Sequence, residues 1–250
     1  MNNDYDRYAR QRQEEILSGK MKSHSMVEKP MMQSMLFDLT GKKVLMLGCG
    51  TGDESILLKE FGASDITGVD LSEVSVNIAN ECYPDCTFKV MDMHKLDFED
   101  ETFDFVYSSL TVHYSDKPEE VYKEVNRVLK KDGKLLFSIG HPLRWASKVV
   151  EHEGITYRIF GCSYDKEVDE VYGNYNTMTK IEDKFPSGEV LQFYTVAPSQ
   201  TFKQLRRCGF DVLDFTESQC IEEAKESALN YYIKYKEMPN FMAFLARKNG

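Results

Sequence analysis

Apolar and polar positions alternate in a regular way between residues 43 and 140. Short apolar runs predict strands at residues 43–48, 65–70, 86–91, 103–109 and 134–140. Segments with apolar residues at helical spacing predict helices between them, at about 53–61, 73–82 and 117–130. Apolar strands that alternate with amphipathic helices are typical of a parallel sheet with right-handed crossovers. The pattern therefore predicts an α/β fold.

The pattern is different before and after this region. Residues 1–40 are polar and weakly patterned, apart from Met31, Met35 and Leu39 at the helical spacing of side chains that pack on a sheet. Residues 143–198 are rich in Tyr, Phe, Thr and Gly, and their alternating stretches predict an inserted region of paired strands. Beyond the insert we expect a helix at 201–208, a strand at 210–216, a helix at 221–235 and a strand at 241–247.

A glycine-rich turn joins the first predicted strand to the first helix at Gly48, Gly50 and Gly52. Because glycine has no Cβ and tolerates positive φ, a ligand can approach the backbone here, close to a helix N-terminus. Asp70 ends the second strand about 20 residues past the glycines, where a carboxylate accepts hydrogen bonds from ribose hydroxyls. Asp53 stands where a dinucleotide fingerprint has its third glycine, so the turn fits a nucleoside with a small zwitterion better than a pyrophosphate. An ordinary glycine turn is the alternative.

Motifs in the order of a known family follow one another along this region. They are VLMLGCGTG (44–52), GVDLS (68–72), VMDM (90–93), FDFVYSSLTVHY (103–114) and LKKDGKLLFSIGHP (129–142). Together they resemble the successive motifs of class I S-adenosylmethionine-dependent methyltransferases, in the broad group that modifies small molecules. The resemblance covers about residues 41–142, and residues 202–218 resemble the late helix and strand of the same group.

The resemblance implies a Rossmann-like sheet of seven strands, mostly parallel with an antiparallel last strand, with helices on both faces. It implies a single domain over residues 1–250, with a cofactor-binding core at 41–142 and 199–250. Residues 1–40 are then a helical lid. Residues 143–198, inserted after the fifth strand, are expected to cover the substrate, as long insertions at a ligand-binding edge usually do.

The cofactor implied by the resemblance is S-adenosylmethionine. The residues expected to bind it are Gly48, Gly50, Gly52, Asp70, Leu71, Asp92, Met93 and Ser108. By the resemblance, Asp92 bonds the exocyclic amine of adenine, and Met93 offers a backbone donor or an apolar face to the ring. A simple capping role for Asp92 after its strand is the alternative. Tyr5 and Tyr8 are candidates for lid residues.

Methyl transfer requires mainly an in-line approach of the acceptor. A neutral amine acceptor loses its proton easily, whereas a hydroxyl or carbon acceptor usually needs a base. His113, after the fourth strand, is the first candidate for that base and His141, at the end of the fifth, is the second, although a lone histidine is often structural. Tyr114, Trp145 and Tyr194 are expected to line the substrate site. The aromatic residues of the insert fit packing of the insert on itself equally well.

Two positions depart from the pattern of the family. Members usually carry an acidic residue at the position of Met46, where it helps to hold the amino group of the cofactor's methionine part. Asp53 is a possible substitute. Related enzymes often carry Tyr-His-Arg where this chain has Tyr194, Thr195 and Val196. Substrate preferences that depend on that His and Arg are therefore not transferred.

Composition narrows the choice of partners. A hydrophobic fraction of 42% is ample for a core, and a net charge of −10 disfavours a nucleic-acid backbone as the main partner. We expect neither a secretory signal nor a membrane span. The 6 cysteines show no metal-ligand spacing, the nearest pair being Cys82 and Cys86, so we expect no metal and a reduced, cytoplasmic protein.

Three functions remain open on the sequence. The leading interpretation is an S-adenosylmethionine-dependent methyltransferase that acts on a small molecule. An NAD-dependent oxidoreductase is disfavoured by the glycine spacing and by the segment around Asp92. A non-catalytic S-adenosylmethionine-binding or interaction protein is suggested by Met46 and by the missing Tyr-His-Arg.

Overall fold

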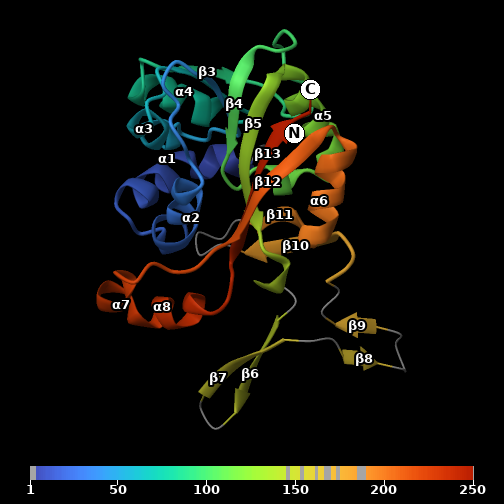
Figure 1. Ribbon diagram of the computed structural model, residues 1–250. Helices are drawn as coiled ribbons and strands as arrows, with labels where there is room; N and C mark the ends of the chain where they lie inside the picture. The colour runs from blue at the N-terminus through green and yellow to red at the C-terminus, as the bar shows by residue number, and fades with distance from the viewer. Residues whose placement is uncertain are drawn as a thin grey trace.

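A seven-stranded sheet with the order β12-β13-β5-β4-β1-β2-β3 forms the centre of the protein (Figure 1). The computed structural model describes residues 4–144, 147–152, 155–160, 163–165, 170–172, 175–184 and 190–249. The strands of the sheet are β1 (Lys43–Leu47), β2 (Asp65–Asp70), β3 (Thr87–Val90), β4 (Phe103–Ser108), β5 (Leu129–Gly140), β12 (Phe210–Glu217) and β13 (Phe241–Lys248). β13 runs antiparallel to both of its neighbours, β5 and β12, and the other pairs of this sheet are parallel. The predicted Rossmann-like sheet is confirmed.

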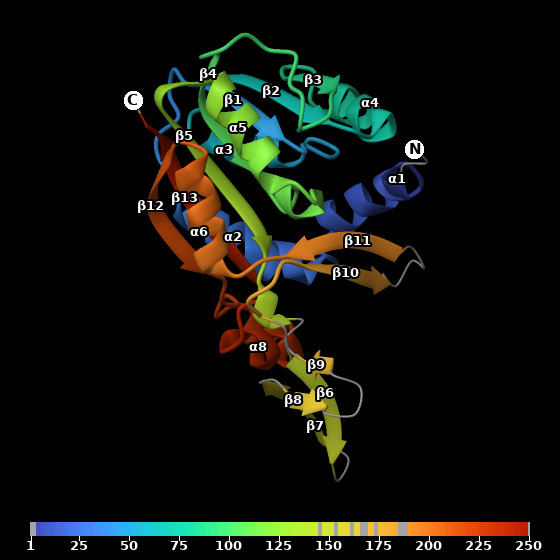
Figure 2. The ribbon, with the colours of Figure 1, turned by 90° about the vertical axis from the view of Figure 1, so that its right-hand side faces the viewer.

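Helices cover both faces of this sheet (Figures 1 and 2). They are α1 (Asp4–Leu17), the π-helix η1 (His24–Glu28), α2 (Lys29–Ser34), α3 (Glu54–Glu60), α4 (Glu73–Cys82), α5 (Pro118–Val128), α6 (Pro198–Arg207), α7 (Ala224–Ser227) and α8 (Leu229–Lys236), with the 3₁₀ turns η2 (Val112–Tyr114) and η3 (Pro142–Arg144). Residues of η1, α2, α3 and α4 share one core with the sheet, and residues of α5 and α6 share a second core on its other face. The sheet is therefore buried on both sides, as a parallel sheet requires.

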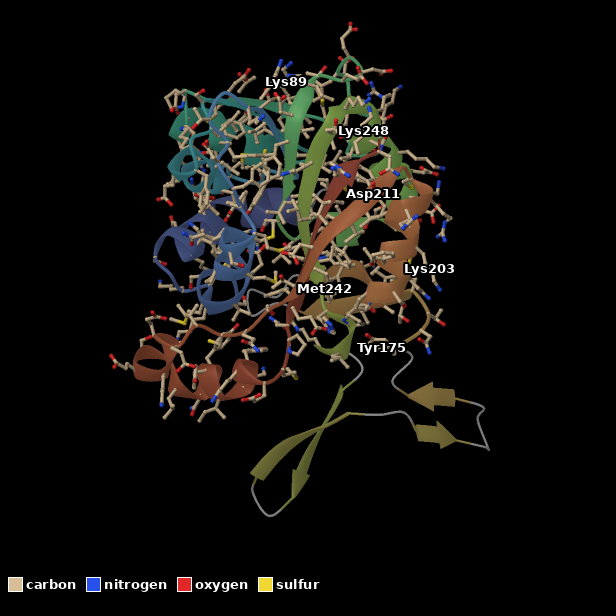
Figure 3. All side chains as sticks on the ribbon, viewed as in Figure 1. Lys89, Tyr175, Lys203, Asp211, Met242 and Lys248 are labelled. Atoms are coloured by element: carbon tan, nitrogen blue, oxygen red, sulfur yellow. The ribbon has the colours of Figure 1, made fainter. Side chains whose placement is uncertain are left out.

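Helix α6 shows how the spacing of apolar residues sets the packing. Its first helical residue is Pro198. Proline is tolerated at this position because a backbone N–H there would have no hydrogen-bond partner within the helix. Thr201 and Leu205, four residues apart, are buried against the sheet, whereas Lys203 lies on the outer face and points away from it (Figure 3). Met242 of β13 is fully buried in the same core (Figure 3).

Apart from shifts of a few residues at the ends of elements, the structure differs from the predicted elements at two places. β5 begins at Leu129, before the predicted strand, because the chain continues through Asp132 at φ 61 and its register with β4 shifts there. The helix predicted at 221–235 is divided into α7 and α8 at Ala228, whose backbone, at φ −153 and ψ 53, is not helical. Both differences come from single backbone conformations that side-chain periodicity does not report.

The insert forms pairs of antiparallel strands, as predicted. They are β6 (Ser147–His152) with β7 (Ile155–Phe160), β8 (Ser163–Asp165) with β9 (Glu170–Tyr172), and β10 (Thr179–Lys184) with β11 (Val190–Thr195). Figures 1 and 2 show the first two pairs extending away from the sheet, whereas β10 and β11 lie close to its end. Phe193 of β11 packs its ring against His113 of η2, with 5.4 Å between the centroids. The division into lid, core and substrate cover stays a prediction.

Candidate cofactor-binding site

A cavity of about 480 Å³ lies at the carboxyl ends of β1, β2, β3 and β4, with α1 beside it. Its lining consists of Ala9, Arg12, Gly48, Gly50, Thr51, Val69, Asp70, Leu71, Ser75, Met91, Asp92, Met93, His94, Ser109, Leu110, Thr111, Tyr114 and Asp116. This volume is in the usual range for a cofactor pocket, and the position is where open α/β sheets bind ligands. Of the predicted cofactor residues, Gly52 and Ser108 are absent from this lining.

The three glycines of the turn all have positive φ, but they differ in what surrounds them. A Cβ at Gly48 would overlap the side chain of Thr111, and one at Gly52 would lie 3.0 Å or less from Tyr83 and Phe88. A Cβ at Gly50 would meet nothing within 4 Å. Gly48 and Gly52 are thus required by packing, whereas Gly50 opens the backbone to the cavity.

Asp70 ties the glycine turn to the next strand. Its Oδ2 accepts a hydrogen bond from the Gly50 N–H at 2.9 Å, and its Oδ1 accepts one from the Ser72 N–H at 2.9 Å. Burial raises the pKa of this carboxyl, and the two backbone donors oppose that shift. Each oxygen keeps a lone pair, so the carboxylate remains able to accept hydrogen bonds from a ligand.

Asp92 and His94 form a hydrogen-bonded pair on the cavity wall. Asp92 Oδ1 accepts from the His94 backbone N–H at 2.9 Å and lies 2.7 Å from its Nδ1, while His94 Nε2 lies 2.7 Å from Ser115 Oγ. Burial acts to raise the pKa of Asp92, but the hydrogen bonds from His94 outweigh it and lower the pKa. Ser115 is buried and its Oγ accepts from the Lys117 N–H at 2.9 Å, so it serves the start of α5 and is no exposed nucleophile.

Helix α1 contributes the positive charge of the cavity. Arg12 and Ala9 belong to the lining, one helical turn apart. The same lining holds the carboxylates of Asp70, Asp92 and Asp116. Among these described residues the fixed charges sum to a negative value, which favours a cationic ligand, while Arg12 offers a separate partner for a carboxylate.

Sequence reasoning missed Arg12 and His94. The signal for Arg12 was present, because positions 5, 9 and 12 share a face of a helix and Tyr5 was already a lid candidate. The side chains of Tyr5 and Tyr8 lie outside the described part of the chain. His94 follows the strand-ending Asp92 by two residues, a spacing that lets a carboxylate bond the backbone and ring together.

The two predicted bases lie outside the cavity lining. His113 Nδ1 accepts from the Gly140 N–H at 3.2 Å, and burial lowers the pKa of His113 to about 3. His141 Nδ1 accepts from the Leu143 N–H at 3.2 Å, its Nε2 lies 2.8 Å from Glu217, and burial lowers its pKa. Both rings are therefore neutral at pH 7 and carry their proton on Nε2.

The remaining predicted residues divide between the cavity and its supports. Leu71, Met93 and Tyr114 belong to the lining. Ser108 is buried and its hydroxyl donates to the Leu47 carbonyl at 3.0 Å, which connects β4 to β1. Tyr194 is half-buried on β11, and Trp145 lies outside the described residues.

Met46 and its suggested substitute, Asp53, both lie outside the cavity lining. Met46 is buried in the core on the face of η1 and α2. Asp53 accepts hydrogen bonds from the hydroxyls of Thr51 and Tyr83, the latter at 2.9 Å, and does not belong to the cavity lining.

Over the described residues, no three His, Cys, Asp or Glu side chains gather as metal ligands. No helix in the described ranges has both the length and the apolar character that a membrane crossing demands.

The structure is an α/β protein with a cavity at the ligand-binding end of its sheet, and comparison with known proteins narrows this class. Residues 45–137 match the model of the methyltransferase domain family. Demethylmenaquinone methyltransferase of Thermotoga maritima is 35% identical over 180 residues, which cover 71% of this chain and 74% of that protein. An S-adenosylmethionine-dependent methyltransferase structure from Mesorhizobium loti has a TM-score of 0.72 at 25% identity and covers 88% of this chain and 97% of that one.

The chain belongs to the S-adenosylmethionine-dependent methyltransferases. This confirms the predicted family and enzyme class, together with S-adenosylmethionine as the cofactor, and removes the support for an NAD-dependent oxidoreductase.

An uncharacterized protein of Haemophilus influenzae, 33% identical over 133 residues, is also matched over 50% of this chain. The chain spans about half the length of that relative, 52%, and 29% of the sterol 4-C-methyltransferase of Caenorhabditis elegans.

Proposed function

We propose that the protein transfers the methyl group of S-adenosylmethionine to a small-molecule acceptor. The observation that carries the proposal is an aromatic wall at the cavity. Tyr114 belongs to the cavity lining, and its ring lies 4.6 Å from the ring of His113 and 6.4 Å from that of Phe193 on β11. The wall leads from the cofactor cavity to the insert, and rings of this kind favour a flat or apolar acceptor.

The relatives and the charge support a small acceptor. Two relatives are named as methyltransferases of demethylmenaquinone and of a sterol, although another is named for the protein eEF1A. The net charge of −10 and the acidic residues of the cavity disfavour a polyanionic nucleic acid.

The residues present fit the cofactor. The open space beside Gly50 leaves room for a ligand against the backbone, and we assign the Asp70 carboxylate to the ribose hydroxyls. We assign Asp92 and Met93 to the adenine and Arg12 to the carboxylate of the methionine part. When bound, S-adenosylmethionine supplies a methyl group on a cationic sulfonium, so orientation of the acceptor by the aromatic wall accounts for most of the remaining catalysis.

We infer an acceptor that needs no strong base, such as a neutral amine. His113 and His141 each have Nδ1 engaged by a backbone N–H, so their neutral rings present an N–H on the other side. A general-base role for either histidine stays a prediction. In the arrangement described here, Nε2 would first have to lose its proton before it could accept one from the acceptor. A neutral amine would use its own lone pair to bond the methyl group, the electrons of the broken C–S bond would stay on S-adenosylhomocysteine, and the ammonium product would release its proton to water.

Transfer of labelled methyl groups tests this proposal. The purified protein is incubated with S-adenosylmethionine labelled in the methyl group and with a cell extract divided into small molecules, protein and RNA. We expect label in the small-molecule fraction, and amine-containing pools are then tested separately. Label confined to protein or RNA would overturn the proposal. Tight cofactor binding without transfer to any fraction would favour the non-catalytic alternative.

A further inference from the structure

A buried network of charged side chains joins the N-terminal π-helix η1 to the sheet. His24 lies between two carboxylates: its Nδ1 is 3.2 Å from Glu28 Oε2, and its Nε2 is 2.9 Å from Glu54 Oε1. The Tyr107 hydroxyl of β4 donates to Glu54 Oε2 at 2.8 Å. Burial acts to lower the pKa of His24, but Glu28 and Glu54 raise it to about 10. A cationic imidazole thus faces two carboxylates, which leaves the network with a net negative charge.

One end of this network reaches the cofactor cavity through Ser109. Glu28 Oε1 accepts from the hydroxyl of Ser109 at 2.9 Å and from that of Ser138 at 2.6 Å. Ser109 belongs to the cavity lining, whereas Glu28 is fully buried and its Oε2 has no hydrogen bond besides the His24 ion pair.

The hydrogen-bond inventory of Ser109 restricts what it can bind. A serine hydroxyl has one proton and two lone pairs, and the proton of Ser109 is directed to Glu28. Toward the cavity the oxygen is therefore left as an acceptor, polarised by the buried carboxylate behind it. Its natural partner is an N–H donor, and a cationic ammonium group most of all.

The network occupies the layer in which the family places a different carboxylate. Met46 pairs in register with Tyr107, and both side chains lie in one core with Val27 of η1 and Met32 of α2. An acidic residue at position 46 would enter this same layer. Here the negative charge comes instead from the residue that follows Val27 in η1, and π-helical turns of this kind are frequent at functional sites.

We propose that Glu28 is a positioning residue for the amino group of the methionine part of S-adenosylmethionine, acting through Ser109 in place of the carboxylate that Met46 lacks. His24 and Ser138 fix the Glu28 carboxylate, and Ser109 presents its oxygen to the ammonium. Replacing a whole buried ionic network by apolar residues of the same size is often neutral for stability, although removing one partner alone is destabilising. A role in binding accounts for the position of this network beside the cavity. The inference depends on the cofactor assignment and not on the acceptor.

Calorimetric titration with two ligands tests the role of Glu28. The ligands are S-adenosylhomocysteine and its deamino analogue, which keeps the adenosine and the carboxylate but lacks the amino group. We expect Glu28→Gln to weaken binding of S-adenosylhomocysteine by about tenfold or more, the scale of a lost hydrogen bond to a charged group. Binding of the deamino analogue should change by less than about twofold.

Two further variants keep the test decisive. Ser109→Ala removes one hydroxyl and should give the same selective loss, even where Glu28→Gln folds poorly. Glu124→Gln is the control, because Glu124 is likewise an ion-paired carboxylate, to Arg127, but it is only partly buried and does not belong to the cavity lining. It should leave both affinities unchanged.

Each other outcome has a definite meaning. An equal loss for both ligands, or no loss with either Glu28→Gln or Ser109→Ala, would overturn the role of Glu28 and leave the cofactor assignment intact. Failure of the unaltered protein to bind S-adenosylhomocysteine would overturn the cofactor assignment itself.

Discussion

The two sides of the cofactor cavity are built by different means. On the strand side, Asp70 and Gly50 lie close in sequence to buried strands and are held by backbone hydrogen bonds. On the N-terminal side, Arg12 comes from a separate helix. Glu28 is connected to the cavity through Ser109, which directly follows β4. The first side follows from local motifs, whereas the second exists only after the chain has folded. Changes at the glycines of the strand side should therefore act through the backbone, and changes on the N-terminal side should act through charge.

The pH dependence of stability should give the largest effect, and it belongs to the N-terminal side. The pKa of His24 is raised from 6.5 in a free side chain to about 10 in the fold. Its stabilising contribution is therefore complete below pH 6.5 and is lost as the pH rises toward 10. We expect unfolding free energy, measured by urea titration, to fall by at most about 1.4 kcal/mol per pH unit over this window.

His24→Gln is the comparison for that prediction. It removes the titrating ring, so the variant should be less stable at pH 7 and should show a flatter profile between pH 7 and 10. A profile as steep as that of the unaltered protein would show that His24 is not charged in the fold.

Gly48→Ala should be the most damaging change on the strand side. The alanine would be held at the positive φ of this position and its Cβ would overlap Thr111, so we expect a loss of about 3 kcal/mol in unfolding free energy. Gly50→Ala, with open space around the new Cβ, should cost only about 1 kcal/mol but should reduce cofactor affinity. Urea unfolding and calorimetry together separate the two effects. Equal destabilisation by both variants would contradict the distinction between the glycines.

Asp70→Ala should weaken S-adenosylhomocysteine binding by about tenfold or more, since it removes a charged hydrogen-bond acceptor and frees two backbone N–H groups. Asp65→Ala, an exposed carboxylate at the start of the same strand, is the control. Calorimetry that finds the same affinity in Asp70→Ala and Asp65→Ala would refute the ribose assignment.

Arg12→Gln should give the smallest of these effects, about fivefold in affinity for S-adenosylhomocysteine, because the Arg12 side chain is only half-buried and solvent screens part of its charge. Methylthioadenosine, which lacks the carboxylate, should bind Arg12→Gln and the unaltered protein equally. A similar loss for both ligands would assign Arg12 to another part of the cofactor.

Local sequence patterns were sufficient for the sheet, for the glycine turn and for the place of Asp70, because each depends on periodicity or on a backbone need of its own segment. They were insufficient for Glu28, whose partners Ser109 and Ser138 come from distant parts of the chain, whereas the local signals for Arg12 and His94 were present and were missed. The early start of β5 and the break at Ala228 also escaped, since each depends on a single backbone conformation. The predicted roles of His113 and His141 rested on position in a loop, which says nothing about the hydrogen bonds of the ring.

Phe88 of β3 has a consequence for how related sequences vary. Its ring fills the space that a Cβ would need at Gly52 and also at Gly68 of β2. Neither glycine is then an independent signature of nucleoside recognition. Across homologues, a smaller residue at position 88 should appear together with alanine or serine at 68, a covariation that evolutionary alignments would detect as a coupled pair.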